Sequence, residues 1–257
     1  VADAIADAEH GEATARPIPS PQGTAIVRVG SLTAAMTGAN RATLDALGAE
    51  YFTVHTHVNQ HAGYFPGAQP VHILMHVGTD GQILGAQAVG ADGVDRRIDV
   101  IATAMRAGLS ATDLIDLDLA YAPPYGQAKD PVNQTGMVAH NVLTGELVLI
   151  GPDALTEDMP VLDVRTVGEY AAGHMPNSLN IPHTQLRDRL DEVRAWVDEN
   201  VGDQPFVVMC AAGVRSWIGY RIVRHAGFNA TMLSGGIQTL RAWLGEKAEA
   251  VLVKGEG

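Results

Sequence analysis

The chain has 257 residues, of which 46% are hydrophobic and 18% charged, so it has apolar material for one large or two ordinary globular domains. Its net charge of −12 argues against nucleic acids and anionic membranes as partners, because both attract clustered Lys and Arg. No apolar run approaches the roughly 20 residues that span a bilayer, no signal peptide is expected, and a single cysteine fits a reducing compartment, so we expect a cytoplasmic protein.

The first half of the chain predicts an α+β domain at residues 20–145, because strands are followed by helices. Residues 1–19 form a terminal helix and a Pro-rich linker, with Val1, Ile5 and Ala8 on one helical face. The expected strands lie at 25–29, 51–58, 71–77 and 83–89, with a tight turn at 78–81. The expected helices run from the N-cap Asn40 to near Gly48, over 95–107, over 111–119, and through Val138 to about Leu143.

From about residue 146 to residue 257 the pattern changes to short apolar strands that alternate with helices. This alternation predicts an α/β domain with a mostly parallel sheet, buried on both faces. The expected strands lie at 160–164, 178–182, 206–210 and 230–233. The expected helices lie at 169–173, 186–199, 214–226 and 237–244.

The only cysteine, Cys210, follows a buried strand at the edge where open α/β sheets place their ligands. A lone cysteine is usually a core residue, so its surroundings must decide its role. Gly213 permits backbone angles that other residues resist, and Arg215 lies in the first turn of the next helix. The loop amides, the helix dipole and Arg215 together favour a reactive thiolate and an anionic persulfide. We therefore interpret Cys210 and Arg215 as catalytic and the residues between them as a persulfide cradle, namely Ala211, Ala212, Gly213 and Val214.

Three motifs in this half, in the right order, resemble the signatures of a rhodanese domain. They are LDVRTVGEYAAGHMPNSLNIP, CAAGVRS and LSGGIQTLRAW. In that family the cysteine takes a sulfane sulfur from a donor and passes it to a nucleophilic acceptor, and the resemblance implies this role for Cys210. Four residues separate Cys210 from Arg215, as in sulfurtransferases, whereas the loop of related phosphatases is one residue longer. The resemblance therefore implies a sulfurtransferase and argues against a phosphatase.

The residues after the cysteine bear on the sulfur donor. Many rhodaneses that use thiosulfate have a basic residue directly after the cysteine, whereas this chain has Ala211 and Ala212. A small apolar mouth fits a thiol persulfide better than thiosulfate, and the expected substrate is a small-molecule thiol persulfide, for example one on coenzyme A.

Five further residues of this half are singled out, and the first three have two readings each. By resemblance, Asp163 and Arg165 support the active loop, either as a structural ion pair or through direct contact with substrate. His174 lies in a turn, where a stabilising role is favoured over that of a catalytic base. Trp217 and Trp243 are expected to be packing residues.

The segments HAGYFPGA, LGAQAVGADGVDRRIDVIATAMRAG and AYAPPYGQAKDPVN resemble the dimerisation domain of flavin-dependent pyridine nucleotide–disulfide reductases. The type resembled is the coenzyme A-disulfide reductase or NADH-oxidase-like group with a fused rhodanese domain. The resemblance implies a homodimer, and it places residues 1–19 at the end of a preceding flavin domain. Tyrosines from such loops contact the partner's substrate site in some members, or pack at the interface. The candidates are Tyr64, Tyr121 and Tyr125.

Cofactors are expected only for a longer parent protein, for which the resemblance implies FAD, NAD(P)H and coenzyme A. The chain itself contains no Gly-x-Gly-x-x-Gly after a strand, so no cofactor is expected to bind to it. No metal site is expected either, because the histidines lack acidic or cysteine ligands at a recognised spacing. These histidines are His55, His57, His61, His72 and His76.

The sequence as a whole therefore predicts a two-domain enzyme in which a rhodanese-type sulfurtransferase acts through a Cys210 persulfide. Two alternatives stay open. One is a fragment of an FAD- and NAD(P)H-dependent disulfide oxidoreductase with no activity of its own, and the other is a rhodanese-like module that only binds.

Overall fold

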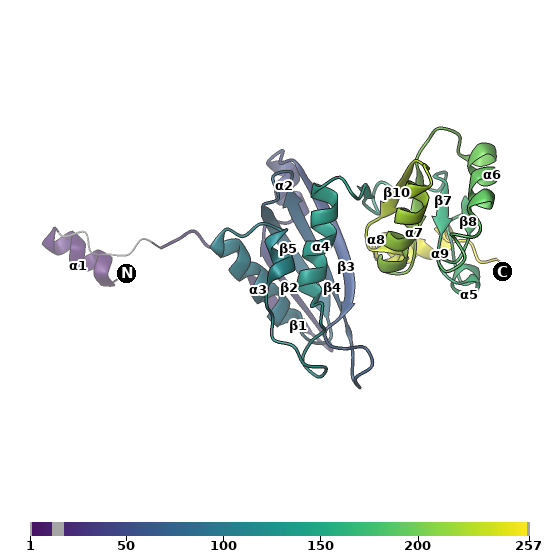
Figure 1. Ribbon diagram of the computed structural model, residues 1–257. Helices are drawn as coiled ribbons and strands as arrows, with labels where there is room; N and C mark the ends of the chain where they lie inside the picture. The colour runs from purple at the N-terminus through teal and green to yellow at the C-terminus, as the bar shows by residue number, and fades with distance from the viewer. Residues whose placement is uncertain (1, 12–17, 256–257) are drawn as a thin grey trace.

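The computed structural model describes residues 2–11 and 18–255. The terminal helix that the sequence predicts is present as α1 (Ala2–His10), while Val1 and residues 12–17 of the Pro-rich linker lie outside the described residues. Two domains follow α1, side by side, with strand β3 (Tyr51–Asn59) of the first facing the second (Figure 1). None of the helices in the described part of the chain is long and apolar enough to cross a membrane.

The first domain is a five-stranded antiparallel sheet with helices on one face (Figure 1). Its strand order is β1-β2-β5-β4-β3. The remaining strands are β1 (Ala25–Val29), β2 (Leu32–Gly38), β4 (Pro70–Gly78) and β5 (Ile83–Gly90). The helices are α2 (Arg41–Ala46), α3 (Val94–Ala107) and α4 (Pro131–Leu143), of which α3 and α4 pack on the sheet.

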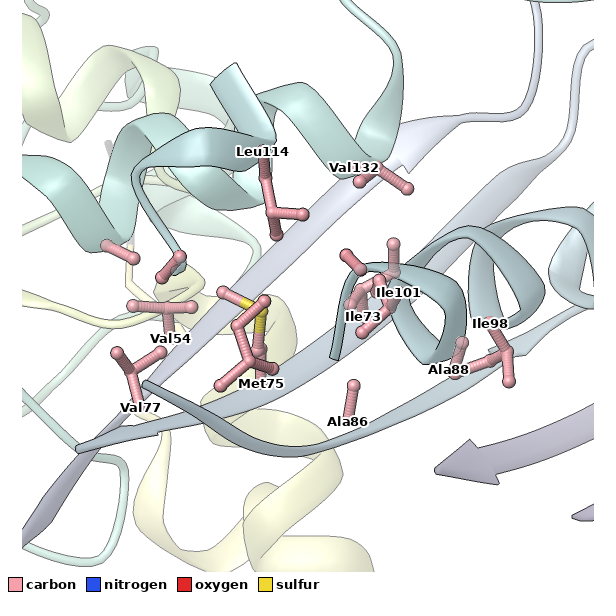
Figure 2. Packing of buried hydrophobic residues seen from close by; sticks show 14 of the residues in the cluster. Val54, Ile73, Met75, Val77, Ala86, Ala88, Ile98, Ile101, Leu114 and Val132 are labelled. Carbon is pink, nitrogen blue, oxygen red and sulfur yellow. The ribbon is translucent and has the colours of Figure 1, made fainter. Parts of the chain in front are cut away.

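Alternation along the strands builds the core of this domain. In β4 every second side chain from Val71 to Val77 is buried against the helices, and Val54 of β3 lies opposite Met75 (Figure 2). The helix α3 contributes Ile98 and Ile101 to the same cluster. Each such aliphatic side chain contributes roughly 1.5–3 kcal/mol when fully buried. The side chains between them, His72 among them, face the other side of the sheet.

Two predictions for this domain are wrong. Strand β2 was not predicted, because its small and polar residues carry little alternation of hydrophobicity. The predicted helix at 111–119 is only a short 3-10 turn, η1 (Asp113–Asp116). The side-chain amide of Asn133 donates to the carbonyls of Leu114, Ile115 and Leu117, so tertiary contacts take carbonyls that a helix would use.

The second domain is a five-stranded parallel sheet, as the alternating pattern predicts, with the order β6-β10-β9-β7-β8. Its strands are β6 (Leu149–Ile150), β7 (Val161–Asp163), β8 (Ser178–Asn180), β9 (Phe206–Met209) and β10 (Ala230–Leu233). Its helices are α5 (Val167–Ala171), α6 (Leu190–Asn200), α7 (Val214–His225), α8 (Gly236–Leu244) and α9 (Ala248–Val251). The α+β followed by α/β fold class is therefore confirmed.

Helix α6 begins at Leu190, four residues after the predicted start at Leu186. Leu186 is fully buried, and the segment around it consists of turns, such as the one in which the amide of Asp188 donates to Gln185. The apolar residue therefore marks the core under these turns and not the first turn of a helix. The short elements β6 and α9 were not predicted.

Candidate active site at Cys210

Cys210 lies directly after the central strand β9, and its side chain is only 1% exposed. The backbone amide of Gly213 donates to Cys210 Sγ over 3.2 Å. Ser216 Oγ lies 3.2 Å from the same sulfur and 2.9 Å from the Gly213 carbonyl, to which it donates. The sulfur is thus held by one backbone donor and one hydroxyl at the start of α7, and the sequence prediction did not include Ser216.

The Cys210 loop (residues 210–215) turns its first carbonyls away from the sulfur. Ile237 N donates to Cys210 O over 2.9 Å, and Gln238 N donates to Ala211 O over 3.1 Å. Both donors lie at the N-terminus of α8. Among the amides expected to form a cradle, that of Gly213 is the one with a hydrogen bond to Sγ in the described structure. Ala211, Ala212, Gly213 and Val214 lie between Cys210 and Arg215, with Val214 65% exposed at the mouth of the loop.

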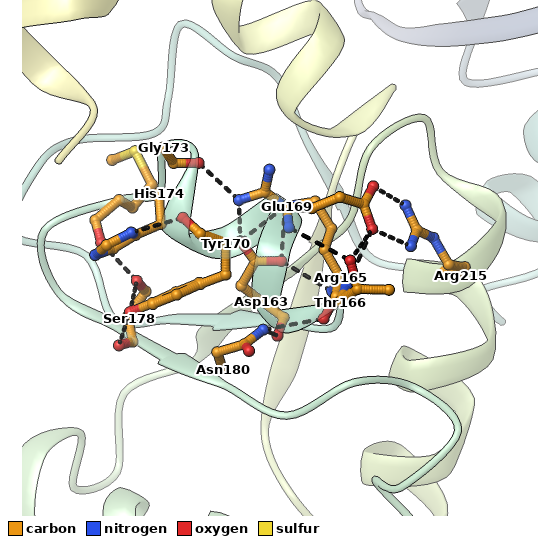
Figure 3. A network of polar contacts seen from close by, with 11 residues as sticks. Asp163, Arg165, Thr166, Glu169, Tyr170, Gly173, His174, Ser178, Asn180 and Arg215 are labelled. Atoms are coloured by element: carbon orange, nitrogen blue, oxygen red, sulfur yellow. Dashed lines mark hydrogen bonds and ion pairs between the residues drawn. The ribbon is translucent and has the colours of Figure 1, made fainter. Parts of the chain in front are cut away.

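Arg215 is held by a carboxylate that the sequence prediction did not include. Its guanidinium donates to both carboxylate oxygens of Glu169, over 2.6 and 2.7 Å (Figure 3). This pairing lowers the pKa of Glu169 from 4.5 to about 2 and raises the pKa of Arg215. Cys210 adds a smaller contribution to the rise for Arg215. The positive charge expected beside the sulfur is therefore paired with the negative charge of Glu169. Glu169 also lies at position N3 of α5, where it forms a capping box with the N-cap residue Thr166.

Asp163 and Arg165 form a buried ion pair at the end of β7 (Figure 3). Their side chains are 0% and 5% exposed, and Arg165 also donates to the carbonyl of Gly173 over 2.8 Å. The geometry supports the structural reading of this pair, since it connects β7 to the turn after α5. It leaves little surface for direct contact with substrate.

His174 lies in the turn after α5, where its ring stacks on Tyr170 with centroids 3.7 Å apart. Its Nδ1 lies 2.9 Å from the carbonyl oxygen of Tyr170, and its backbone pairs with Val253. These contacts fit the stabilising role favoured by the sequence. Trp217 stacks on Tyr220, and Trp243 is half exposed beneath the guanidinium of Arg41.

A cavity of about 610 Å³ lies between the two domains and reaches the Cys210 loop. The loop contributes Ala212, Gly213 and Val214 to its wall. Apolar side chains from α4 and both sheets line much of the rest, with the amides of Asn59, Gln127, Gln134 and Asn141 among them. Among the described residues that line it, Lys129 alone carries a full charge. The sequence prediction had no means to place this cavity, because its walls come from both domains.

Two histidines of β3 contact the second domain directly. His55 Nδ1 lies 2.8 Å from Ser234 Oγ, and His57 Nε2 lies 2.6 Å from Thr239 Oγ1. Burial lowers the pKa of both histidines from 6.5 to about 4, so both are neutral near pH 7. Within the described residues, no group of three or more His, Cys, Asp or Glu side chains is arranged to hold a metal ion. Instead, His57 pairs with His72, Thr53 contacts His76, and His61 contacts its neighbour's carbonyl.

The three candidate tyrosines lie on exposed loops of the first domain. Tyr64, Tyr121 and Tyr125 are 79%, 50% and 73% exposed. A hydrogen bond between Tyr64 and Tyr121 raises the pKa of Tyr64, so these two hydroxyls are adjacent. None of the three is among the described residues that line the cavity at the Cys210 loop.

Comparison with known families identifies both domains. Residues 24–131 match the dimerisation domain of pyridine nucleotide-disulphide oxidoreductases, and residues 152–242 match the rhodanese-like domain. The chain thus joins a domain that matches the reductase dimerisation domain to one that matches the rhodanese-like domain, in the order that the sequence motifs predict.

Three relatives match different lengths of this chain. The chain is 37% identical to reduced Bacillus anthracis CoADR-RHD, with a TM-score of 0.87 over 97% of this chain and 43% of that one. It is 38% identical to an NAD-dependent persulfide reductase from A. fulgidus, with a TM-score of 0.78 over 88% of this chain and 41% of that one. It is also 43% identical over 91 residues to coenzyme A disulfide reductase of Staphylococcus aureus, which is 35% of this chain and 21% of the relative. The chain therefore spans about a fifth of that curated relative and about two fifths of the solved structures.

Proposed function

We propose that the second domain is a sulfurtransferase in which Cys210 carries a sulfane sulfur. The observation that supports this most directly is the position of Cys210 Sγ, which accepts from the Gly213 amide over 3.2 Å at the N-terminus of α7. A helix N-terminus and inward amides stabilise negative charge on sulfur, first on the thiolate and then on the outer sulfur of a persulfide.

The reaction has two displacements. The Cys210 thiolate attacks the outer sulfur of a donor R–S–SH, so a new S–S bond forms at Cys210 while the donor S–S bond breaks and RS⁻ leaves. A thiolate acceptor, or sulfite, then attacks the outer sulfur of the Cys210 persulfide, and the Cys210 thiolate is regenerated. No net oxidant or reductant is consumed, because the sulfane sulfur moves with its oxidation state unchanged.

The cavity favours a thiol persulfide as the donor over thiosulfate. Its wall next to the Cys210 loop is formed by Ala212, Val214 and Trp217, while the guanidinium of Arg215 is already paired with Glu169. The small dianion thiosulfate would lose hydration without gaining a cationic partner at this mouth. A larger thiol body would bury apolar surface against the same wall and use the amide side chains further along it.

For the longer protein to which these domains would belong, we propose an FAD- and NAD(P)H-dependent reductase of persulfides or coenzyme A disulfide. The names of the relatives support this role, and the dimerisation domain supports a homodimer. In that protein Tyr64, Tyr121 and Tyr125 are the candidates for contact with the partner subunit. No metal, FAD or NAD(P)H takes part in the displacements proposed for Cys210.

The test is sulfur transfer by this chain and its Cys210→Ser variant, with glutathione persulfide, coenzyme A persulfide and thiosulfate as donors. We expect mass spectrometry to detect one added sulfur atom on Cys210, and turnover to be lost in the variant. Folded protein that never gains this sulfur would overturn the proposal and favour a module that only binds. A clear preference for thiosulfate would contradict the donor class but not the sulfurtransferase.

A further inference from the structure

The Gly–Gly turn, formed by Gly235 and Gly236, lies between β3 and the Cys210 loop. Both glycines have positive φ angles, of 67° and 62°. A Cβ atom on Gly235 would come within 2.9 Å of His57 Nε2 and 2.8 Å of His55 Cβ. A Cβ atom on Gly236 would come within 2.4 Å of the Cys210 carbonyl oxygen. One residue of the turn therefore touches the first domain and the next touches the catalytic loop.

Hydrogen bonds join the residues around the turn to the first domain on one side and to the Cys210 loop on the other. On the side of the first domain, His55 contacts Ser234 and His57 contacts Thr239, through the 2.8 and 2.6 Å contacts described above. Ser234 Oγ also accepts from the backbone amide of His55 over 3.0 Å. Ser234 and Thr239 are 1% and 6% exposed, so these contacts are shielded from water.

On the side of the Cys210 loop, the amides of Ile237 and Gln238 donate to the carbonyls of Cys210 and Ala211. This matters for sulfur chemistry because a carbonyl oxygen that rotated toward Cys210 Sγ would place a negative dipole end next to an anionic sulfur. A fixed α8 N-terminus keeps these two peptide groups turned away and leaves the loop amides for the sulfur.

We infer that His55 and His57 are positioning residues for Cys210, acting through Ser234, Thr239 and the N-terminus of α8. The inference rests on the proposed function and extends it, since it makes the geometry of the sulfur site depend on the dimerisation domain. The two histidines do not touch the sulfur in this role, although both line the cavity that reaches the Cys210 loop. Their side chains set the position of α8, and α8 sets the orientation of the peptide groups at Cys210.

The chain offers a matched set of variants. Thr239→Val keeps the shape of the side chain and removes the hydroxyl that His57 contacts, and Thr239→Ser restores that hydroxyl. His57→Ala removes the same contact from the other domain. Asp153→Ala is the control, because it breaks a different contact between the domains, the 2.9 Å ion pair with Arg41, and keeps the hydroxyls of Ser234 and Thr239 that His55 and His57 contact.

Three measurements on the full chain read out the effect. We expect Thr239→Val and His57→Ala to speed amide hydrogen exchange at Ile237 and Gln238 by about tenfold, as for the loss of a buried hydrogen bond. We expect a change of about the same size in the rate of Cys210 alkylation by iodoacetamide, and a slower formation of the Cys210 persulfide from glutathione persulfide. Thr239→Ser should restore all three rates, and Asp153→Ala should leave them unchanged.

Unchanged exchange and alkylation in a Thr239→Val protein that melts cooperatively would overturn the inference. Equal effects in Asp153→Ala would also overturn it, because they would assign the change to general loosening between the domains. If the unaltered chain formed no persulfide, the proposed function would fail by itself. Exchange at Ile237 and alkylation of Cys210 would still decide whether the histidines position the loop.

Discussion

The Cys210 loop is held from two sides by contacts of different kinds. On the side of β7 and α5 the support is ionic: Arg215 binds Glu169, and Arg165 binds Asp163 (Figure 3). All of these residues belong to the second domain. Asp163 and Arg165 are two residues apart in the sequence, and Glu169 and Arg215 are 46 residues apart.

On the side of α8 the hydrogen bonds that hold the start of the helix join uncharged groups and come from the other domain. His55 and Ser234 are 179 residues apart, and His57 and Thr239 are 182 residues apart. Both histidines are kept uncharged by burial, and their partners are hydroxyls. The ion pairs at this site therefore lie within the rhodanese-like domain, whereas the hydrogen bonds that we infer to align the loop carbonyls join uncharged groups of the two domains.

The largest expected effect lies on the ionic side. Asp163→Ala would leave the buried guanidinium of Arg165 without its carboxylate, and breaking a buried ion pair from one side costs about 3–5 kcal/mol. We expect the variant to lose that much free energy of unfolding in urea titration, or to fail to accumulate as folded protein. Asp153→Ala, which breaks a partly exposed pair, should cost at most about 1 kcal/mol. Equal free energies of unfolding for the two variants would show that burial does not make the Asp163–Arg165 pair more important for stability.

Lowering the pH should weaken the two sets of contacts at different pH values, because their groups titrate in different ranges. His55 and His57 have pKa values of about 4 in the folded chain and 6.5 when exposed, so the unfolded chain binds more protons as the pH falls. Their contribution is complete above pH 6.5 and is lost between 6.5 and about 4, by roughly 3 kcal/mol per histidine at most. Glu169, with its pKa lowered from 4.5 to about 2, contributes fully above pH 4.5 and is lost only below it.

Amide exchange, corrected for its intrinsic pH dependence, tests this order. The amide of Ile237 reports on the neutral side, and the amide of Thr166, which donates to Glu169 Oε2 over 3.1 Å, reports on the ionic side. Protection at Ile237 should fall first. Arg41 and His76 oppose protonation of His55, as His72 does that of His57, while Asp153 favours protonation of His55. Loss of protection at both amides in the same pH range would contradict the expectation that the histidine contacts are lost at a higher pH than those of Glu169.

The difference between contacts within one domain and contacts between the two domains explains what could be predicted from sequence. Cys210, Gly213 and Arg215 lie within one strand–loop–helix unit, so local spacing is enough to place them. The parallel sheet followed from alternation along the chain. Glu169 carried one local signal, its capping box with Thr166, but that signal identifies a helix start and says nothing of Arg215.

The neutral support could not be predicted, for a physical reason. Alternation placed His55 and His57 on one face of a strand, yet nothing in the sequence says what covers that face. Ser234 and Thr239 are short polar residues of a kind common at the surface, and their burial here depends on how the two domains dock. The cavity that reaches Ala212 arises from the same docking.

The smallest effect on stability, and the sharpest test of the ionic side, is expected from Glu169→Gln. The side chains of Arg215 and Glu169 are 25% and 38% exposed, so their pairing contributes at most about 1 kcal/mol. Glutamine also keeps the hydrogen bonds of the capping box with Thr166. Thermal melting should therefore change little.

The charge at the sulfur should change more, because Arg215 would keep its positive charge with no carboxylate to share it. More uncompensated positive charge beside Cys210 favours the thiolate, so we expect the pH profile of Cys210 alkylation by iodoacetamide to move to lower pH. Glu192→Gln, which breaks the exposed 2.7 Å pair with Arg189, is the matched control and should leave the profile in place. A profile that stayed fixed in Glu169→Gln would mean that Arg215 does not act on the sulfur. The role of Arg215 would then be to anchor α7 to α5, and the Gly213 amide, with Ser216 beside it, would be left to stabilise the thiolate.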